Sequence, residues 1–211
     1  MVLIKQLKGY KEYKTTISNM EKKVLELKKN EEIKEEIWIL EHQEVITAGS
    51  SSNQTFTKIN NIPFVKINRG GQLTYHGPGQ IVIYFMLNIK KRKIGIIEFI
   101  DIIENELIEV FKKKGILLNK KKEKNRGLWI KTKSGEKKII FVGLRYTSGI
   151  IYHGISINIK PNLFNFRLID PCGLKKNQIS SLHEQNININ EKKLLEEIKN
   201  QIFLKFSHTA I

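Results

Sequence analysis

One stretch of the sequence, RGGQLTYHGPGQIVIY at residues 69–84, limits the possible folds more than any other. Four glycines and a proline precede an apolar run that is rich in β-branched residues and predicts a strand. A phosphate-binding loop requires a Gly-Lys-Ser/Thr ending, and a dinucleotide-binding loop requires a helix after the glycines, so neither is present. For the glycines alone, a tight turn with a bulge is the more frequent explanation. Arg69 and His76 favour the wall of a binding site.

The apolar periodicity indicates the fold class. Helical spacing predicts helices at residues 13–32, 94–116 and 190–206, the last capped by Asn190. Strands are predicted at residues 36–45, 63–68, 80–89, 127–132, 136–147 and 150–159, and short polar turns favour antiparallel pairing of the last three. Because strand clusters and helices are segregated, we predict an α+β fold with a mixed or antiparallel sheet flanked by helices. A chain of 211 residues without a dividing linker predicts a single domain over residues 1–211.

Composition narrows the possible partners. The formal net charge of +16 suggests an acidic protein, nucleic acid or an anionic membrane as partner, whereas Lys, Ile and Asn enrichment along the whole chain is also what an AT-rich genome produces. Basic residues do not alternate with aromatic ones as in nucleic-acid-binding sheets, so nucleic acid is the weakest of these hypotheses. The sequence shows neither a membrane-spanning run nor a signal peptide. Together with a single cysteine, this predicts a cytoplasmic protein without membrane partners.

The single cysteine, Cys172, stands between Pro171 and Gly173, which predicts a thiol displayed on a loop. An isolated cysteine is more often a small buried apolar residue than a nucleophile. In the predicted strand KKIIFVGLRY, Lys137 and Lys138 point to opposite faces, so one ammonium can face the core and lower the pKa of a nearby thiol. Two solvated lysines at a hairpin edge are the alternative.

The order and spacing of several motifs resemble one enzyme family. RGGQLTYHGPGQ is followed by GLWI, KKIIFVGLR, YHGISINI, PCG and ISSL, and this series is similar to the lipoyl(octanoyl) transferases of lipoate biosynthesis over about residues 1–183. The resemblance implies the fold of the biotin and lipoate protein ligases. Glu44 stands where the family often has proline, and Gln72 where it often has an acidic residue, which puts the local loop shape in question.

The resemblance also implies residue roles. Cys172 matches the acyl-thioester nucleophile, and Lys138 matches the lysine that lowers its pKa. His153 and Gly77 are possible additions to the site. The family's substrate-binding segments correspond to Arg69, Gly70, Gly71, Gln72, Leu73, Thr74, Tyr75 and His76, to Phe141, Val142 and Gly143, and to Gly154, Ile155 and Ser156.

The activity implied by the resemblance is transfer of an octanoyl group from acyl carrier protein to a lysine of a lipoyl domain, through a cysteine thioester and without cofactor or metal. The implied acceptors are the lipoyl domains of 2-oxoacid dehydrogenase complexes and the glycine cleavage protein. Such partners are acidic, so the positive charge of this chain would attract them. The nearer alternative is an ATP-dependent lipoate or biotin protein ligase of the same fold, and the more distant one is a basic nucleic-acid-binding protein.

Overall fold

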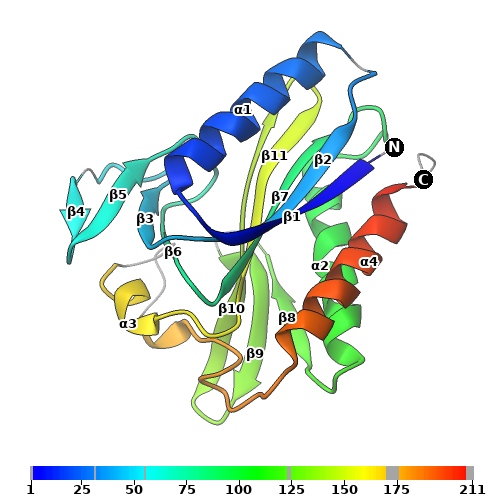
Figure 1. The fold of residues 1–211 in the computed structure, drawn as a ribbon. Coiled ribbons are helices and arrows are strands. Elements are labelled where there is room, and N and C mark those ends of the chain that lie inside the picture. Colours follow the sequence, from blue (N-terminus) through cyan, green and yellow to red (C-terminus); the bar gives the residue numbers. More distant parts are fainter. Residues whose placement is uncertain (1, 31, 55, 123–124, 170–175, 208–211) are drawn as a thin grey trace.

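The computed structural model describes residues 2–30, 32–54, 56–122, 125–169 and 176–207 (Figure 1). The elements are, in chain order, β1 (Val2–Lys11), α1 (Tyr13–Lys29), β2 (Glu35–His42), β3 (Val45–Ala48), β4 (Lys58–Ile59), β5 (Ile62–Lys66), β6 (Leu73–His76), β7 (Gln80–Asn88), α2 (Ile96–Lys112), β8 (Leu118–Lys121), β9 (Gly127–Thr132), β10 (Gly135–Thr147), β11 (Ile150–Asn158), α3 (Leu163–Phe166), the 3-10 turn η3 (Lys176–Gln178) and α4 (Glu191–Ser207).

Within these residues the strands form two sheets. The larger sheet has the order β1-β2-β7-β11-β10-β9-β8, and the smaller one has the order β4-β5-β3-β6. The pairs β1–β2 and β3–β5 are parallel, and the other neighbours are antiparallel, as predicted for the last three predicted strands. The predicted α+β fold with a mixed sheet flanked by helices is confirmed.

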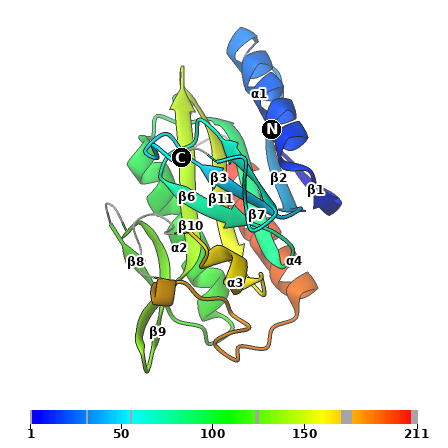
Figure 2. The same ribbon diagram turned by 90° about the vertical axis from the view of Figure 1, so that its left-hand side faces the viewer.

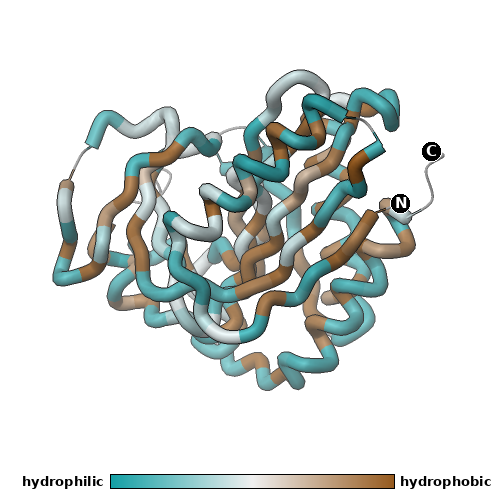
Figure 3. Tube along the Cα trace, turned by 45° about the horizontal axis from the view of Figure 1, so that its top comes forward, coloured by the Kyte–Doolittle hydropathy of each residue, from teal (hydrophilic) through white to brown (hydrophobic). Residues whose placement is uncertain are grey.

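Helices cover both faces of the larger sheet. Helices α2 and α4 lie together on one face, where Phe99 and Phe206 pack on Phe85 of β7. Helix α1 lies over the other face through Ile17 and Met20, near Tyr84 (Figure 2). Figure 3 shows why the helices cover the sheet: the central strands are apolar over long runs, whereas the helices alternate apolar and polar residues and so have one apolar face to pack on the strands. This arrangement leaves the α1 face of the sheet next to the smaller sheet.

Some boundaries differ from the prediction. The predicted strand 36–45 is divided between β2 and β3, which belong to different sheets. Strand β6 lies inside the glycine-containing stretch, and β1 and β8 were not predicted. The predicted helices are present: α1 ends earlier than predicted, α2 is shorter at both ends, and α4 ends one residue later. The Asn190 side chain accepts a hydrogen bond from the Lys193 amide at 3.0 Å, as expected of a cap for α4.

Candidate functional site

A narrow pocket lies between the α1 face of the larger sheet and the smaller sheet. It encloses about 450 Å³, its open mouth included. Its walls come from segments far apart in the sequence, namely the start of α1, the loop before β6, and strands β6, β7, β10 and β11. The lining residues are Tyr13, Arg69, Gly70, Thr74, His76, Val82, Tyr84, Phe141, Val142, Gly143, His153, Gly154, Ile155 and Ser156. The structure therefore brings the three predicted binding segments together at one pocket.

Arg69 organises the loop that forms one wall. Its buried guanidinium donates hydrogen bonds to both oxygens of Thr47, at 2.8 and 2.9 Å, and to the carbonyls of Gly70 and Gln72 at 2.9 and 2.8 Å. The Gly70 amide in turn donates to the carbonyl of Leu144 on β10 at 3.2 Å. A planar donor with fixed N–H directions suits this task, because it satisfies several backbone carbonyls at once. Arg69 thus holds the loop against the larger sheet.

Part of the glycine-containing stretch serves the protein's own packing. Of the predicted binding residues, five do not line the pocket: Gly71, Gln72, Leu73, Tyr75 and Gly77. Gly71 has a φ of +85°, and a Cβ on Gly77 would overlap the Tyr75 hydroxyl. Glycine is required at both positions because the chain turns or passes close to itself there. The tight-turn explanation holds for these residues, and Gly70 is the glycine of this stretch at the pocket wall.

Glu44, which stands where the related family often has proline, has a structural role. Its Oε1 accepts hydrogen bonds from the Tyr75 hydroxyl at 2.7 Å and from the Asn165 side-chain amide at 2.6 Å. Tyr75 also packs against Phe166, with ring centroids 5.7 Å apart. Glu44 therefore connects the smaller sheet to α3.

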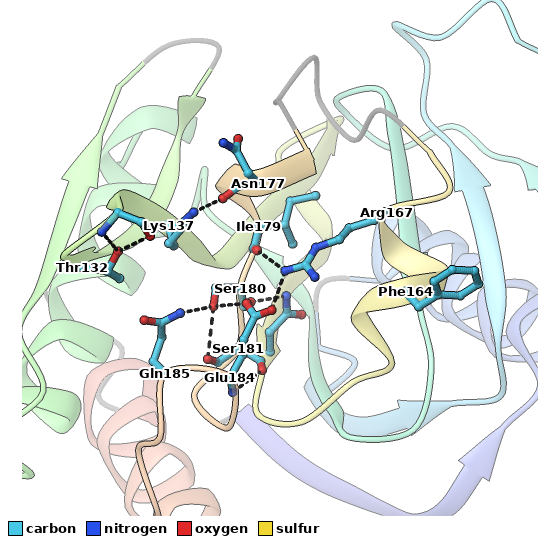
Figure 4. Close-up of polar contacts among 12 residues, drawn as sticks. Thr132, Lys137, Phe164, Arg167, Asn177, Ile179, Ser180, Ser181, Glu184 and Gln185 are labelled. Carbon is cyan, nitrogen blue, oxygen red and sulfur yellow. Dashed lines mark hydrogen bonds and ion pairs between the residues drawn. The ribbon is translucent and has the colours of Figure 1, made fainter.

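Lys138 is buried and Lys137 is not, as strand alternation requires of one of the two. Lys138 is 2% exposed, and its Nζ lies 4.9 Å from the ring centroid of Phe141 and 5.8 Å from that of Trp129. Aromatic faces at these distances favour a cation. Lys137 Nζ instead donates to the carbonyl of Asn177 (Figure 4). A Cβ on Gly127, the first residue of GLWI, would lie 2.7 Å from Cε of Lys138, so glycine makes room for this lysine.

Cys172 lies outside the described residues, and the segments on either side of it are fixed near Lys138. On the C-terminal side, Ser180 donates its amide to the Lys138 carbonyl at 3.0 Å. On the N-terminal side, Arg167 donates to Glu184 at 2.6 Å and to the Ile179 carbonyl at 3.3 Å. Figure 4 shows these groups converging from α3 and from the segment that follows η3. The Arg167–Glu184 ion pair was not predicted.

Polar groups at the inner end of the pocket are uncharged. His42 Nδ1 donates to the Lys11 carbonyl at 3.0 Å, and its Nε2 accepts from the Tyr84 hydroxyl at 2.8 Å. Burial lowers the pKa of His42 to about 4, and burial together with the nearby His42 lowers that of His76 to about 3. Burial also raises the pKa of the Tyr84 phenol. At neutral pH these side chains therefore present neutral polar atoms.

A chain of hydrogen bonds connects the pocket to the backbone of Lys138. His76 Nδ1 donates to Gln80 Oε1 at 2.6 Å, Gln80 Nε2 donates to Asn158 Oδ1 at 2.8 Å, and Asn158 Nδ2 donates to the Ser180 carbonyl at 2.9 Å. The Ser180 amide then binds the Lys138 carbonyl. The members come from HGPGQ, ISINI, ISSL and KKII, so these separate motifs meet in one buried network. The side-chain amides of Gln80 and Asn158 each accept one hydrogen bond and donate another, which fixes the relative positions of the motifs that they join.

Three pocket residues were not predicted. Tyr13 begins α1, where Glu12 caps the helix by accepting from the amides of Lys14 and Thr15. Val82 and Tyr84 lie on β7 and point to the α1 face. The available signal for Tyr84 was its phenol inside an otherwise apolar run, since a buried phenol needs a partner for its hydroxyl.

Replacing His42 by glutamine is expected to flatten the acid dependence of stability. The pKa of His42 is about 4 in the folded protein, below its usual value near 6.5, so the unfolded chain binds more protons and stability falls as the pH drops from about 6.5 to 4. In this window the slope of the unfolding free energy against pH should be smaller in the variant than in the wild type, by up to about 1.4 kcal/mol per pH unit. Urea denaturation at several pH values measures both slopes. Equal slopes in variant and wild type would contradict a buried neutral His42.

No helix within the described residues is both long and apolar enough to cross a membrane.

The pocket suits an elongated, uncharged ligand: its walls are mostly apolar, the histidine and tyrosine side chains at its inner part are neutral, and its wall residue Phe141 adjoins the buried ammonium of Lys138. Such a ligand would carry its reactive carbon beside Lys138.

Comparison with known proteins agrees with this geometry. The model of the lipoyl protein ligase A/B catalytic domain matches residues 16–206. An octanoyltransferase of Buchnera aphidicola is 37% identical over 182 residues, covering 86% of this chain and 83% of the relative, and one of Wigglesworthia glossinidia is 39% identical over 193 residues, covering 91% and 86%.

Solved structures show the same fold. A bi-partite lipoate protein ligase of Thermoplasma acidophilum superposes with a TM-score of 0.71 at 11% identity, covering 98% of this chain and 85% of that one. The biotin protein ligase of Aquifex aeolicus superposes with a TM-score of 0.52 at 12% identity, covering 98% and 69%. The match of the family model over most of the sequence, and relatives above 30% identity over most of their length, establish the relationship. The chain belongs to the lipoyl protein ligase A/B catalytic domain family.

Proposed function

We propose that the protein is an octanoyltransferase, which moves an octanoyl group from acyl carrier protein to a lysine of a lipoyl domain. The observation that carries this proposal is the pocket: its walls are mostly apolar, and its wall residue Phe141 lies against the buried Lys138, whose Nζ is 4.9 Å from the ring centroid. The octanoyltransferases of the two bacteria named above support it. A linear acyl chain is the uncharged, elongated ligand for which such a pocket is suited.

In the proposed mechanism, Cys172 is the nucleophile. Its thiolate attacks the thioester carbonyl of the donor, and the carrier thiolate leaves with a proton from the Lys138 ammonium, giving an octanoyl-cysteine. The neutral amine of Lys138 then takes a proton from the attacking lysine of the acceptor. The octanoyl amide forms, and Lys138 returns the proton to the cysteine thiolate. Each proton is accounted for, and the activated bond arrives with the donor, so ATP has no role.

Positive charge is the basis for the proposed partners. Acyl carrier protein as donor and a lipoyl domain as acceptor are acidic proteins, and a chain with a net charge of +16 attracts both over the range of the screened electrostatic field.

The experiment that tests the function is intact mass spectrometry of the purified protein with octanoyl acyl carrier protein and no ATP. We expect a mass increase of one octanoyl group, removable by hydroxylamine and mapped by peptide analysis to Cys172. Subsequent addition of a lipoyl domain should move the group to its lysine. Labelling that occurs only with free octanoate and ATP would instead indicate an adenylate-forming ligase and refute the proposal.

A further inference from the structure

His153 departs from the side-chain alternation of β11. Ile151 and Ile155 of this strand pack in the core under α2 and α4, so a period of two residues would place His153 on the same face. Its ring instead lies 5.1 Å from the ring of Tyr152 and 6.2 Å from that of Tyr84, both of which belong to the core under α1. The φ of +60° at His153 accounts for the reorientation, which turns the imidazole to the pocket side of the sheet.

This conformation is unfavourable for a residue other than glycine, and strained residues of this kind are concentrated at functional sites. The side chain gains no hydrogen bond in return. Among the described residues, neither Nδ1 nor Nε2 of His153 has a hydrogen-bond partner, although the residue is 1% exposed. The hydroxyl of Thr74, which lines the same pocket and is 6% exposed, also lacks a partner. Buried polar atoms left in this state indicate a water or ligand atom that both groups bind.

The segments that carry the two groups are joined by a series of contacts. His153 is paired with Leu144 across the β10–β11 ladder, and the Leu144 carbonyl accepts the amide of Gly70. The neighbouring Arg69 is bound to Thr47, which pairs with Thr74 on β6. This series connects the two sides of the one pocket that Thr74 and His153 both line.

Lys138 lies beside the pocket, with its ammonium 4.9 Å from the ring of the wall residue Phe141. Phe141 pairs with Ser156, three residues from His153 along β11, which corresponds to about 10 Å of extended chain. An extended eight-carbon chain is about 9 Å long, given carbon–carbon bonds of about 1.5 Å. A thioester carbon placed at the Phe141–Ser156 pair, beside Lys138, would therefore bring the methyl end of an octanoyl group to the level of His153.

We propose that His153 and Thr74 form a polar end wall that sets the length of the acyl chain. The two groups hold ordered water beyond the methyl group of an eight-carbon chain. A longer chain must displace this water and bury polar atoms that an alkyl group cannot satisfy, and this cost selects against it. Burial, together with the nearby Arg69, lowers the pKa of His153 to about 3, so its imidazole is neutral at physiological pH and can bind water. The inference rests on the proposed octanoyl transfer.

The test is a chain-length series of acyl carrier protein thioesters, from hexanoyl to dodecanoyl, with kcat/KM for transfer to a lipoyl domain measured for each. Thr74→Val removes the hydroxyl at nearly constant volume, and His153→Gly removes the imidazole at a position whose positive φ suits glycine. In both variants the decanoyl-to-octanoyl ratio of kcat/KM is expected to rise at least about tenfold, because the decanoyl chain is two methylenes longer and one methylene in an apolar pocket is worth roughly tenfold or more. Thr147→Val, the same change outside the pocket, should leave the ratio unchanged.

The outcomes separate the inference from the function on which it rests. An unchanged ratio in both variants, with octanoyl transfer retained, would overturn the end wall and leave the transferase function standing. Equal loss for every chain length would place the two groups at the reacting carbon and also overturn it. Failure of the wild type with every thioester would refute the proposed function and the end wall with it. Thermal melting curves show whether each variant is folded.

Discussion

Replacing Lys138 by methionine is expected to lower kcat for octanoyl transfer about 1,000-fold, within the range of roughly 10² to 10⁴ typical of a positioned acid–base group. Methionine retains the apolar stem that packs between Trp129 and Phe141, so the change removes little beyond the ammonium. Urea denaturation shows whether the variant is folded, so that a loss of transfer can be assigned to the missing ammonium. Single-turnover formation of the octanoyl-enzyme, followed by mass spectrometry, measures the effect directly.

The neighbouring Lys137 provides the matched control. The Lys137→Met variant carries the same substitution one position earlier on β10, on the face where the ammonium binds the Asn177 carbonyl (Figure 4). It should retain transfer to within a few-fold of wild type. If Lys137→Met abolished transfer and Lys138→Met did not, the assignment of the proton-transferring lysine would be wrong.

Alanine at Gly154 is expected to destabilise the fold by more than about 4 kcal/mol, which is exceptional for a single substitution. A Cβ there would lie 2.7 Å from the carbonyl carbon of Ile83 and still closer to its oxygen. These backbone atoms belong to β7, the central neighbour of β11, and they cannot move away without separating the two strands. We expect loss of the cooperative urea transition, or of folded protein altogether, at neutral pH.

Gly143 is the control for this prediction, because it pairs with Gly154 across the β10–β11 ladder. A Cβ on Gly143 would meet the Arg69 side chain at 3.5 Å and the Gly70 carbonyl at 3.6 Å, which are ordinary contact distances. Its alanine variant should change the urea midpoint only slightly. Similar midpoints for the two variants would mean that the β7–β11 pair has more freedom than its close approach indicates.

The fold class was predictable because its strands and helices show clear periodicity, whereas the missed elements do not. Strand β1 is mostly exposed and interrupted by a register shift near Gly9, so its conformation depends on pairing with β2 and leaves little pattern in the sequence. Strand β6 is buried at every position, and its four residues show no alternation within the glycine-containing stretch. Both depend on partners that a local sequence pattern does not contain.

The segments that form the site could be predicted, but the hydrogen bonds that connect these segments could not. Strand alternation predicted that one of Lys137 and Lys138 is buried, the family resemblance selected Lys138, and the position of Cys172 stays a prediction. The chain of amides through Gln80 and Asn158 could not be predicted, because it joins residues 78 positions apart through side-chain hydrogen bonds. A polar residue at the end of an apolar strand was the available signal. The positive φ of His153 leaves no trace in the strand pattern at all.

The strand order of the larger sheet affects when, during folding, the chain can bind a substrate. Ile83 of β7 pairs with Ile39 of β2 on one side and with Ile155 of β11 on the other, so long intervening segments must close before these contacts form. Closing such loops costs chain entropy before the stabilising contacts form, and chains rich in nonlocal pairings fold in about milliseconds to seconds. The pocket takes residues from β6, β7, β10 and β11, which lie far apart in the sequence. A partly folded chain that has not yet paired these strands therefore has no cavity in which to hold a substrate.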